Sequence, residues 1–231
     1  MSFAHEFHQF VTTHPTEKRG DCFRFSGSNR KHYGMSNPTM RTFVKRFKLD
    51  HAELTYDDWL ATLDGLFRGE SIDEACLGGF MLGEYPKFRA KLALSKLDQW
   101  IGTLEGWREI DTTCQSNFSA KEVLIRWDEW LALLSDFVTR PSIEHRRASL
   151  VLLIKPIRQI ADDRLIIPGL ENIDILKHEE DKLITKAISW LLRTAIKHYD
   201  QKVYGYVETN REQLPSIAIR EFDRKYQTGK K

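Results

Sequence analysis

The chain has 231 residues, of which 41% are hydrophobic, and its 35 basic and 33 acidic side chains leave a formal net charge of +2. This composition excludes disordered, collagenous and coiled-coil proteins, and any nucleic-acid surface must be a local concentration of cations. The longest apolar run, residues 148–154, is much shorter than the roughly 18 residues of a membrane-spanning helix. We therefore expect no membrane contact.

The compartment follows from the cysteines and the first residues. The cysteines are odd in number and too scattered for a disulfide framework or a zinc knuckle: Cys22, Cys76 and Cys114. The first residues have neither a basic region nor an apolar run of the kind that makes a signal peptide. We expect a cytoplasmic protein.

Residues 1–32 are the least regular part of the chain, and we predict an N-terminal helix followed by a basic loop. The stretch 20–33 combines turn residues with four basic groups: Arg24, Arg30, Lys31 and His32. Two interpretations stay open. The loop either contacts a polyanion or is simply solvated, and the second is the commoner case.

Beyond this loop, apolar residues recur at three- and four-residue spacing and no long stretch alternates, which predicts an all-α protein. Asn37 followed by Pro38 reads as a helix cap, and Ser71 and Ser119 each begin a capping box with a glutamate three residues later. Helix breaks are predicted at five positions: Gly69, Gly106, Pro141, Gly169 and Pro215.

A two-helix unit recurs at an interval of roughly 30 to 40 residues, which is typical of helical solenoids. Its copies begin near Thr55, Ala90, Ala120, Asp162 and Asp200. We predict that residues 1–231 form a single domain, with HEAT-like (ARM-like) repeats over 33–231 that curve into a superhelix with a concave basic face. The alternative is an irregular helical bundle.

The predicted helix 182–198 carries an unusual polar face. On a helical wheel its apolar stripe runs from Leu183 to Ala195, whereas Trp190 lies beside the cations of the opposite face. Those cations are Lys182, Lys186, Arg193 and Lys197. An indole among cations suits a polyanion. The alternative is that Trp190 packs against the next repeat and that the four cations form a solvated helix face.

Two further groups are candidates. Trp107 and Asp111 lie one helical turn apart and pair an aromatic plate with a carboxylate, although a core tryptophan and a helix-capping aspartate are common alternatives. Arg146 and Arg147 lie near a helix start, where the helix dipole disfavours cations, so we predict a phosphate site there. The alternative is a salt bridge to Glu144 or Asp136. No nucleotide-binding, metal-binding or acyl-transfer motif is present.

Five segments, in chain order, resemble the DNA alkylation repair glycosylases, the AlkD-like family of HEAT-like repeat proteins. They are YGMSNPTMR (33–41), WREID (107–111), RRASLVLL (146–153), KAISWLLRTAIK (186–197) and IREFDRKY (219–226). The sequence departs from the family pattern at Thr194 and Phe222, and the first 32 residues match little of it.

The resemblance implies a monomeric glycosylase that removes N3- or N7-alkylated purines from duplex DNA, with no cofactor and no metal. It implies that Asp111 is the catalytic carboxylate and that Trp107 and Trp190 are the aromatic plates. It also implies that Arg147 contacts a DNA phosphate. We expect further DNA contacts by Arg146, Lys186, Arg193, Lys197, Tyr33 and Arg41. Two competing functions stay open: a non-catalytic binder of branched or distorted DNA, and a scaffold for another protein.

Overall fold

The computed structural model describes residues 3–14 and 26–229. These residues form α-helices joined by turns, and within them the only strand-like pairing is an isolated bridge between Lys31 and Ser71. The all-α prediction is therefore confirmed. Every helix in these ranges is too short or too polar to cross a membrane.

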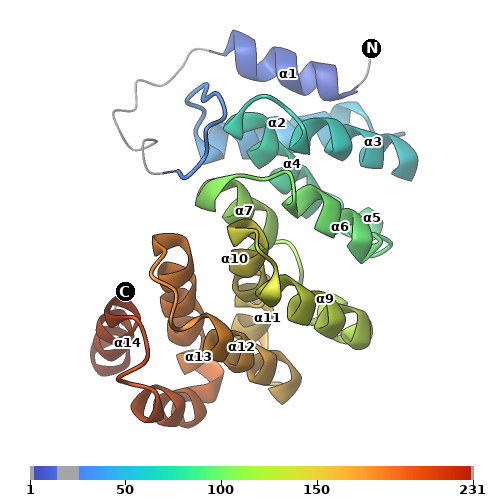
Figure 1. The fold of residues 1–231 in the computed structure, drawn as a ribbon. Helices are drawn as coiled ribbons and strands as arrows, with labels where there is room; N and C mark the ends of the chain where they lie inside the picture. Colours follow the sequence, from blue (N-terminus) through green and yellow to red (C-terminus); the bar gives the residue numbers. More distant parts are fainter. Residues whose placement is uncertain (1–2, 15–25, 230–231) are drawn as a thin grey trace. The chain divides into compact units, whose positions relative to one another are not determined.

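The chain divides into two compact units, Met1–Asn117 and Phe118–Lys231. In Figure 1 the first unit runs from blue to green and contains helices α1 to α7, while the second continues to red and contains α8 to α14. In both units helices pack on one another in succession, as expected for the predicted helical repeat solenoid. The single-domain organisation and the concave basic face stay predictions.

The first unit is built around α4. Its helices are α1 (Phe3–Thr13), α2 (Asn37–Asp50), α3 (Tyr56–Phe67), α4 (Ile72–Glu84), α5 (Pro86–Arg89), α6 (Leu94–Ile101) and α7 (Gly106–Cys114). Residues 72–82 of α4 are all buried, because α1, α2, α3 and α7 pack around this helix. A side chain on Gly79 would put its Cβ 2.9 Å from the backbone of Thr112, so this glycine allows α4 and α7 to approach closely.

The predicted N-terminal helix is α1, and aromatic rings join it to α2. Phe7 contacts Phe43 and Phe47 with ring centroids 5.0 and 4.7 Å apart, and Phe10 stacks on Phe43 at 3.7 Å. Phe7 and Phe47 are fully buried. Burial of these large apolar rings stabilises the contact of α1 with the repeats that follow.

The second unit is built around α13. Its helices are α8 (Ala120–Ile125), α9 (Trp127–Thr139), α10 (Ile143–Val151), α11 (Ile154–Gln159), α12 (Asp163–Leu176), α13 (Lys182–Thr209) and α14 (Ser216–Thr228). Helices α10, α11, α12 and α14 all pack against α13. The long α13 is kinked at Tyr199, whose φ of −136° is not helical, so a second helical segment begins at Asp200 as predicted.

Side-chain hydrogen bonds fix this kink. The Tyr199 hydroxyl accepts a hydrogen bond from the Asp162 N–H at 2.6 Å and donates to the Asp162 carbonyl at 2.8 Å. Tyr199 therefore fastens the bend of α13 to the start of α12.

The capping boxes at Ser71 and Ser119 are confirmed. Two other predictions of helix boundaries are wrong. The cap of α2 is Ser36 rather than Asn37, because its extended backbone lets the Ser36 Oγ accept from the Thr39 N–H at 3.2 Å. Gly169 does not break a helix but lies buried inside α12, where its missing side chain leaves room for Leu191 of α13.

Candidate functional site

The first group of candidate residues lies on α7, which begins sharply at Gly106. The backbone there has φ +68°, a left-handed conformation that favours glycine, and an added Cβ would lie 2.0 Å from the Ser26 carbonyl oxygen. That oxygen accepts the Trp107 N–H at 3.0 Å. One of the free N–H groups of the first helical turn is thus satisfied by a chain segment some eighty residues away in sequence.

Helix α7 has one buried face and one exposed face. Glu109, Ile110 and Thr113 are fully buried, whereas Trp107 is 38% exposed and Asp111 is partly exposed. Trp107 and Asp111 therefore share the outward face, one turn apart, as predicted. The alternatives of a core tryptophan and a capping aspartate are wrong: Trp107 is among the exposed large side chains, and Asp111 follows the N-cap, Glu105, by six positions.

This arrangement offers a planar π face beside a carboxylate at the surface of one helix. An indole face attracts cations, and a carboxylate held on a helix stabilises positive charge that develops next to it. The pair is therefore suited to a reaction in which a cationic group is bound and positive charge forms close by.

The second group lies on α13 in the other unit. The predicted apolar stripe is buried at Ile184, Ala187, Ile188, Leu191 and Ala195, and only Leu183 is partly exposed. On the opposite face Lys182, Lys186 and Lys197 are exposed, and Trp190 is half-buried between them. Within the described residues, neither the Lys182 nor the Lys186 ammonium group has a hydrogen-bonding or ionic partner.

The remaining cations of that face are already engaged. Arg193 forms an ion pair with Glu221 of α14 at 3.1 Å and donates from Nε to the Ser189 carbonyl oxygen at 3.2 Å. Lys197 donates to the Arg158 carbonyl oxygen at 3.1 Å. The cations of this face therefore differ in their availability to a ligand. Those whose ammonium groups have no partner within the described residues, Lys182 and Lys186, lie near the start of α13.

Arg146 and Arg147 lie in the first turns of α10, whose N-cap is Ser142. Arg146 forms a bidentate salt bridge with Glu179, at 2.7 and 3.1 Å, so an ionic partner is present, but neither Glu144 nor Asp136 is that partner. Arg147 is only 4% exposed and its guanidinium donates to the Leu183 carbonyl oxygen in the first turn of α13. Arg147 thus joins α10 to the lysine-bearing helix.

Tyr33 and Arg41 were expected to contact DNA. The Tyr33 hydroxyl donates to Glu70 at 2.7 Å, and the exposed Arg41 guanidinium lies 4.3 Å above the Phe80 ring. Both side chains therefore have contacts within the first unit.

A buried acidic group on α7 was missed by the sequence analysis. Glu109 is fully buried and accepts hydrogen bonds from the Ser28 hydroxyl and the Glu105 N–H, each at 2.9 Å. Its nearest cation is Arg30, at 3.4 Å. Burial raises the pKa of Glu109 to about 7, although these contacts and the Arg30 charge oppose that rise.

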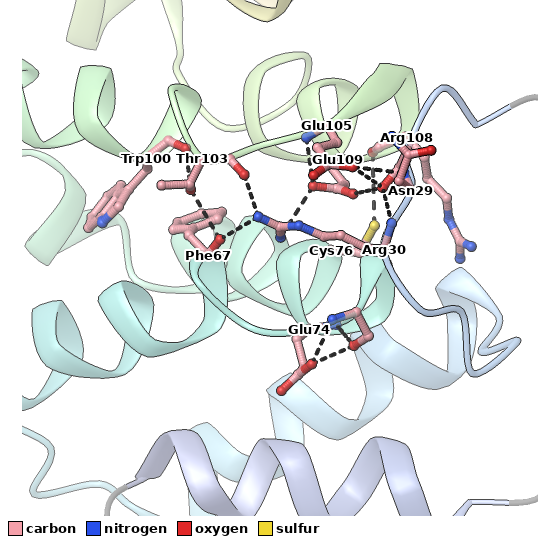
Figure 2. A network of polar contacts seen from close by, with 12 residues as sticks. Asn29, Arg30, Phe67, Glu74, Cys76, Trp100, Thr103, Glu105, Arg108 and Glu109 are labelled. Atoms are coloured by element: carbon pink, nitrogen blue, oxygen red, sulfur yellow. Dashed lines mark hydrogen bonds and ion pairs between the residues drawn. The ribbon is translucent and has the colours of Figure 1, made fainter.

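Figure 2 shows this network, with Arg30 between Glu109 and the helix-terminal carbonyls of Phe67 and Thr103. Neither interpretation of the basic loop therefore fits Arg30, because it is an internal side chain. No local signal marks this pairing, since its members are nearly eighty positions apart. Arg24 and Cys22 lie outside the described residues, whereas Cys76 and Cys114 are buried.

One family model matches the chain. The family model described as "DNA alkylation repair enzyme" matches residues 6–222, nearly the whole chain. A solved structure described as a predicted DNA alkylation repair enzyme from Enterococcus faecalis is 16% identical, with a TM-score of 0.70 over 87% of this chain and 90% of that chain. A comparison with curated proteins finds no match. From the extent of the family match, the chain belongs to the DNA alkylation repair enzyme family.

Proposed function

We propose that this protein is a DNA glycosylase of base excision repair that removes cationic N3- and N7-alkylated purines, such as 3-methyladenine and 7-methylguanine, from duplex DNA. The observation that carries the proposal is the Trp107–Asp111 pair on the exposed face of α7, in a chain of the DNA alkylation repair family. The pair supplies the two groups that this reaction needs at the protein surface.

The chemistry explains why so small a site suffices. A purine alkylated at N3 or N7 is positively charged and leaves as a neutral base, so no general acid has to protonate it. As the glycosidic bond breaks, positive charge moves to the deoxyribose, which becomes an oxocarbenium ion. The Asp111 carboxylate stabilises this charge and orients the attacking water, while the Trp107 face attracts the cationic nucleotide. The role of Trp190 as a second aromatic plate stays a prediction.

Binding to DNA is assigned to the stripe on α13. Lys182 and Lys186 are exposed and their ammonium groups lack partners within the described residues, so their charges are available to phosphates. No base-reading motif accompanies them, and binding is therefore dominated by sequence-independent phosphate contacts. The protein acts as a monomer on double-stranded DNA, with neither cofactor nor metal.

The second candidate function is non-catalytic binding of distorted or branched DNA. The lysine stripe on α13 supports this function as it supports the first, because both need cations that bind phosphates. Non-catalytic binding has no use for Asp111. The two candidates therefore differ in what they require of α7 alone.

The test is incubation with a duplex that carries a single 7-methylguanine, followed by alkaline cleavage of abasic sites. A glycosylase leaves an abasic site at the position of the lesion, and the alkali cleaves the strand there. Tight binding to the duplex without any cleavage supports the second candidate and rejects the first.

A further inference from the structure

Residues 26–36, here called the strap, run along the first unit between α4 and α7. On the α4 side, the Ile72 N–H donates to the Lys31 carbonyl oxygen at 2.9 Å. The carboxylate of Asp73 accepts the Tyr33 N–H at 2.7 Å and the Met35 N–H at 3.0 Å. Asp73 is fully buried, so the start of α4 holds the strap by charge-assisted hydrogen bonds.

On the α7 side, the strap contacts the first turns of the helix. The Ser26 carbonyl oxygen accepts the Trp107 N–H at 3.0 Å, and the Asn29 N–H donates to the Glu105 carboxylate at 2.7 Å. One turn further, Arg108 donates to the Met35 carbonyl oxygen at 2.9 Å. Helix α7 is thus fastened at several points to a segment that is itself fastened to α4.

The centre of this arrangement is the ion pair between Arg30 and Glu109, with 3.4 Å between Nη1 and Oε2. The Arg30 Nη2 also donates to the carbonyl oxygens of Phe67, at the end of α3, and Thr103, just after α6. Figure 2 shows the guanidinium in this position, with Phe67 and Thr103 on one side and Glu109 on the other. One side chain of the strap therefore connects three helices.

The periodicity of α7 makes this connection relevant to the exposed pair. Arg108 and Glu109 are buried and hydrogen-bond to the strap, whereas Trp107 and Asp111 lie on the outward face. Because Glu109 lies between them in sequence, any rotation of α7 that releases Glu109 also moves the carboxylate of Asp111. A reaction that depends on a fixed carboxylate is sensitive to displacements of about 1 Å.

We propose that Arg30 and Glu109 are positioning residues that fix the orientation of the Trp107–Asp111 face through the strap. The catalytic consequence rests on the proposed glycosylase function, whereas the structural consequence does not. The pair touches neither DNA nor the reacting atoms in this account. It sets the rotation of α7 about its own axis.

The experiment labels the tryptophans of the whole protein with 5-fluorotryptophan and records ¹⁹F NMR spectra, with the Trp107 signal assigned by Trp107→Phe. Arg30→Lys keeps the charge but loses the planar fork that binds three partners at once. Spectra are recorded well above the pKa of about 7 of Glu109, where its carboxylate is ionised, so that Glu109→Gln removes the negative charge that pairs with Arg30. Both variants are expected to shift or broaden the Trp107 signal and leave the Trp190 signal in place. Ser28→Ala, which removes one hydrogen bond to Glu109, is a milder third variant and shifts the same signal less.

Asp64→Asn is the matched control. Asp64 accepts hydrogen bonds from Lys96 at 2.8 Å and from the Trp100 indole at 2.7 Å. It lies in the same unit, and within the described residues it makes no hydrogen bond or ion pair with the strap itself. This variant is expected to move the Trp100 signal and leave that of Trp107 unchanged. An unchanged Trp107 signal in folded Arg30→Lys and Glu109→Gln overturns the proposal, as does a shift of equal size in Asp64→Asn.

Single-turnover excision of 7-methylguanine gives the second measurement. Arg30→Lys and Glu109→Gln are expected to lower the rate roughly tenfold to a hundredfold while DNA affinity stays within about twofold. Equal losses of rate and affinity overturn the positioning role. A parent protein that excises nothing rejects the proposed function only, because the NMR measurement does not depend on excision.

Discussion

Glu221 of α14 neutralises Arg193 of α13: their Oε2 and Nη2 atoms are 3.1 Å apart, and Glu221 also accepts a hydrogen bond from Ser189. Lys186, two turns earlier on the same face, is exposed and has no such partner within the described residues. Two cations that look equivalent on a helical wheel therefore differ in their capacity to bind a polyanion.

We predict that Lys186→Ala weakens binding to duplex DNA more than Arg193→Ala does. Each phosphate contact that is lost removes about 1 from the slope of log affinity against log salt concentration. The slope should fall by about that amount for Lys186→Ala and by clearly less for Arg193→Ala, whose charge is already paired. Fluorescence anisotropy with a labelled duplex, at several salt concentrations, measures both slopes.

The matched control is Glu221→Gln. It keeps an acceptor for Ser189 but frees the Arg193 charge, so affinity and salt dependence should increase. Equal slopes for the parent and for Lys186→Ala contradict the assignment of this face to DNA.

Asp111→Asn should lower excision by a factor on the order of 10² to 10³. The amide is nearly the same size as the carboxylate but cannot offer a full negative charge to an oxocarbenium ion. Because Asp111 is partly exposed on the outward face of α7, we expect the fold and most of the DNA affinity to persist. The measurement is the single-turnover rate of 7-methylguanine release, alongside thermal unfolding.

Two outcomes speak against this role of Asp111. One is a rate within about twofold of the parent. The other is a variant that no longer folds, which would make Asp111 a structural residue.

Glu109 should make stability depend on pH. Burial raises its pKa from near 4.5 to about 7, so the folded protein retains a proton that the unfolded chain releases. Between these two values the free energy of unfolding should fall as pH rises, by up to about 1.4 kcal/mol per pH unit from this group. Urea unfolding between pH 4 and pH 8 measures the slope, which should flatten in Glu109→Gln. Superimposable pH profiles of the parent and Glu109→Gln would contradict a raised pKa of Glu109.

Two glycines should respond oppositely to alanine. Gly106→Ala should destabilise the protein by at least about 1 to 2 kcal/mol, because L-residues avoid its φ of +68° and the new Cβ meets the Ser26 oxygen. Gly205→Ala is the control, since this helical glycine has nothing within 4 Å of an added Cβ, and should stabilise by roughly 0.5 to 1 kcal/mol. Thermal unfolding distinguishes them. A neutral Gly106→Ala contradicts the close contact between the strap and α7.

Features that are decided by local chemistry could be predicted from the sequence. Ser71 and Ser119 cap helices through glutamates three residues away, and the buried stripe of α13 follows its own periodicity. The four-residue spacing of Trp107 and Asp111 likewise predicts that both lie on one face of α7, although it does not say that this face is the exposed one. In each of these cases the deciding contacts lie within a few turns of one helix.

Features that depend on a partner distant in sequence could not be predicted. Gly169 reads as a helix break, but the side chain of Leu191 fills the space beside it and α12 continues. Arg193 and Arg30 read as available cations, yet Glu221 and Glu109 pair with them. Pairings of this kind depend on which helices pack together, and no local pattern encodes that packing.

The most direct test of the central claim compares base release from duplexes that are identical except for one lesion. Among the described residues, the proposed Trp107–Asp111 site has no general acid that would protonate a neutral leaving base, so the positive charge of the lesion must activate it. We predict that 7-methylguanine is released, whereas uracil and 1,N6-ethenoadenine remain attached under the same single-turnover conditions. Efficient removal of uracil, or no release of 7-methylguanine by a folded protein that binds the duplex, would contradict the account.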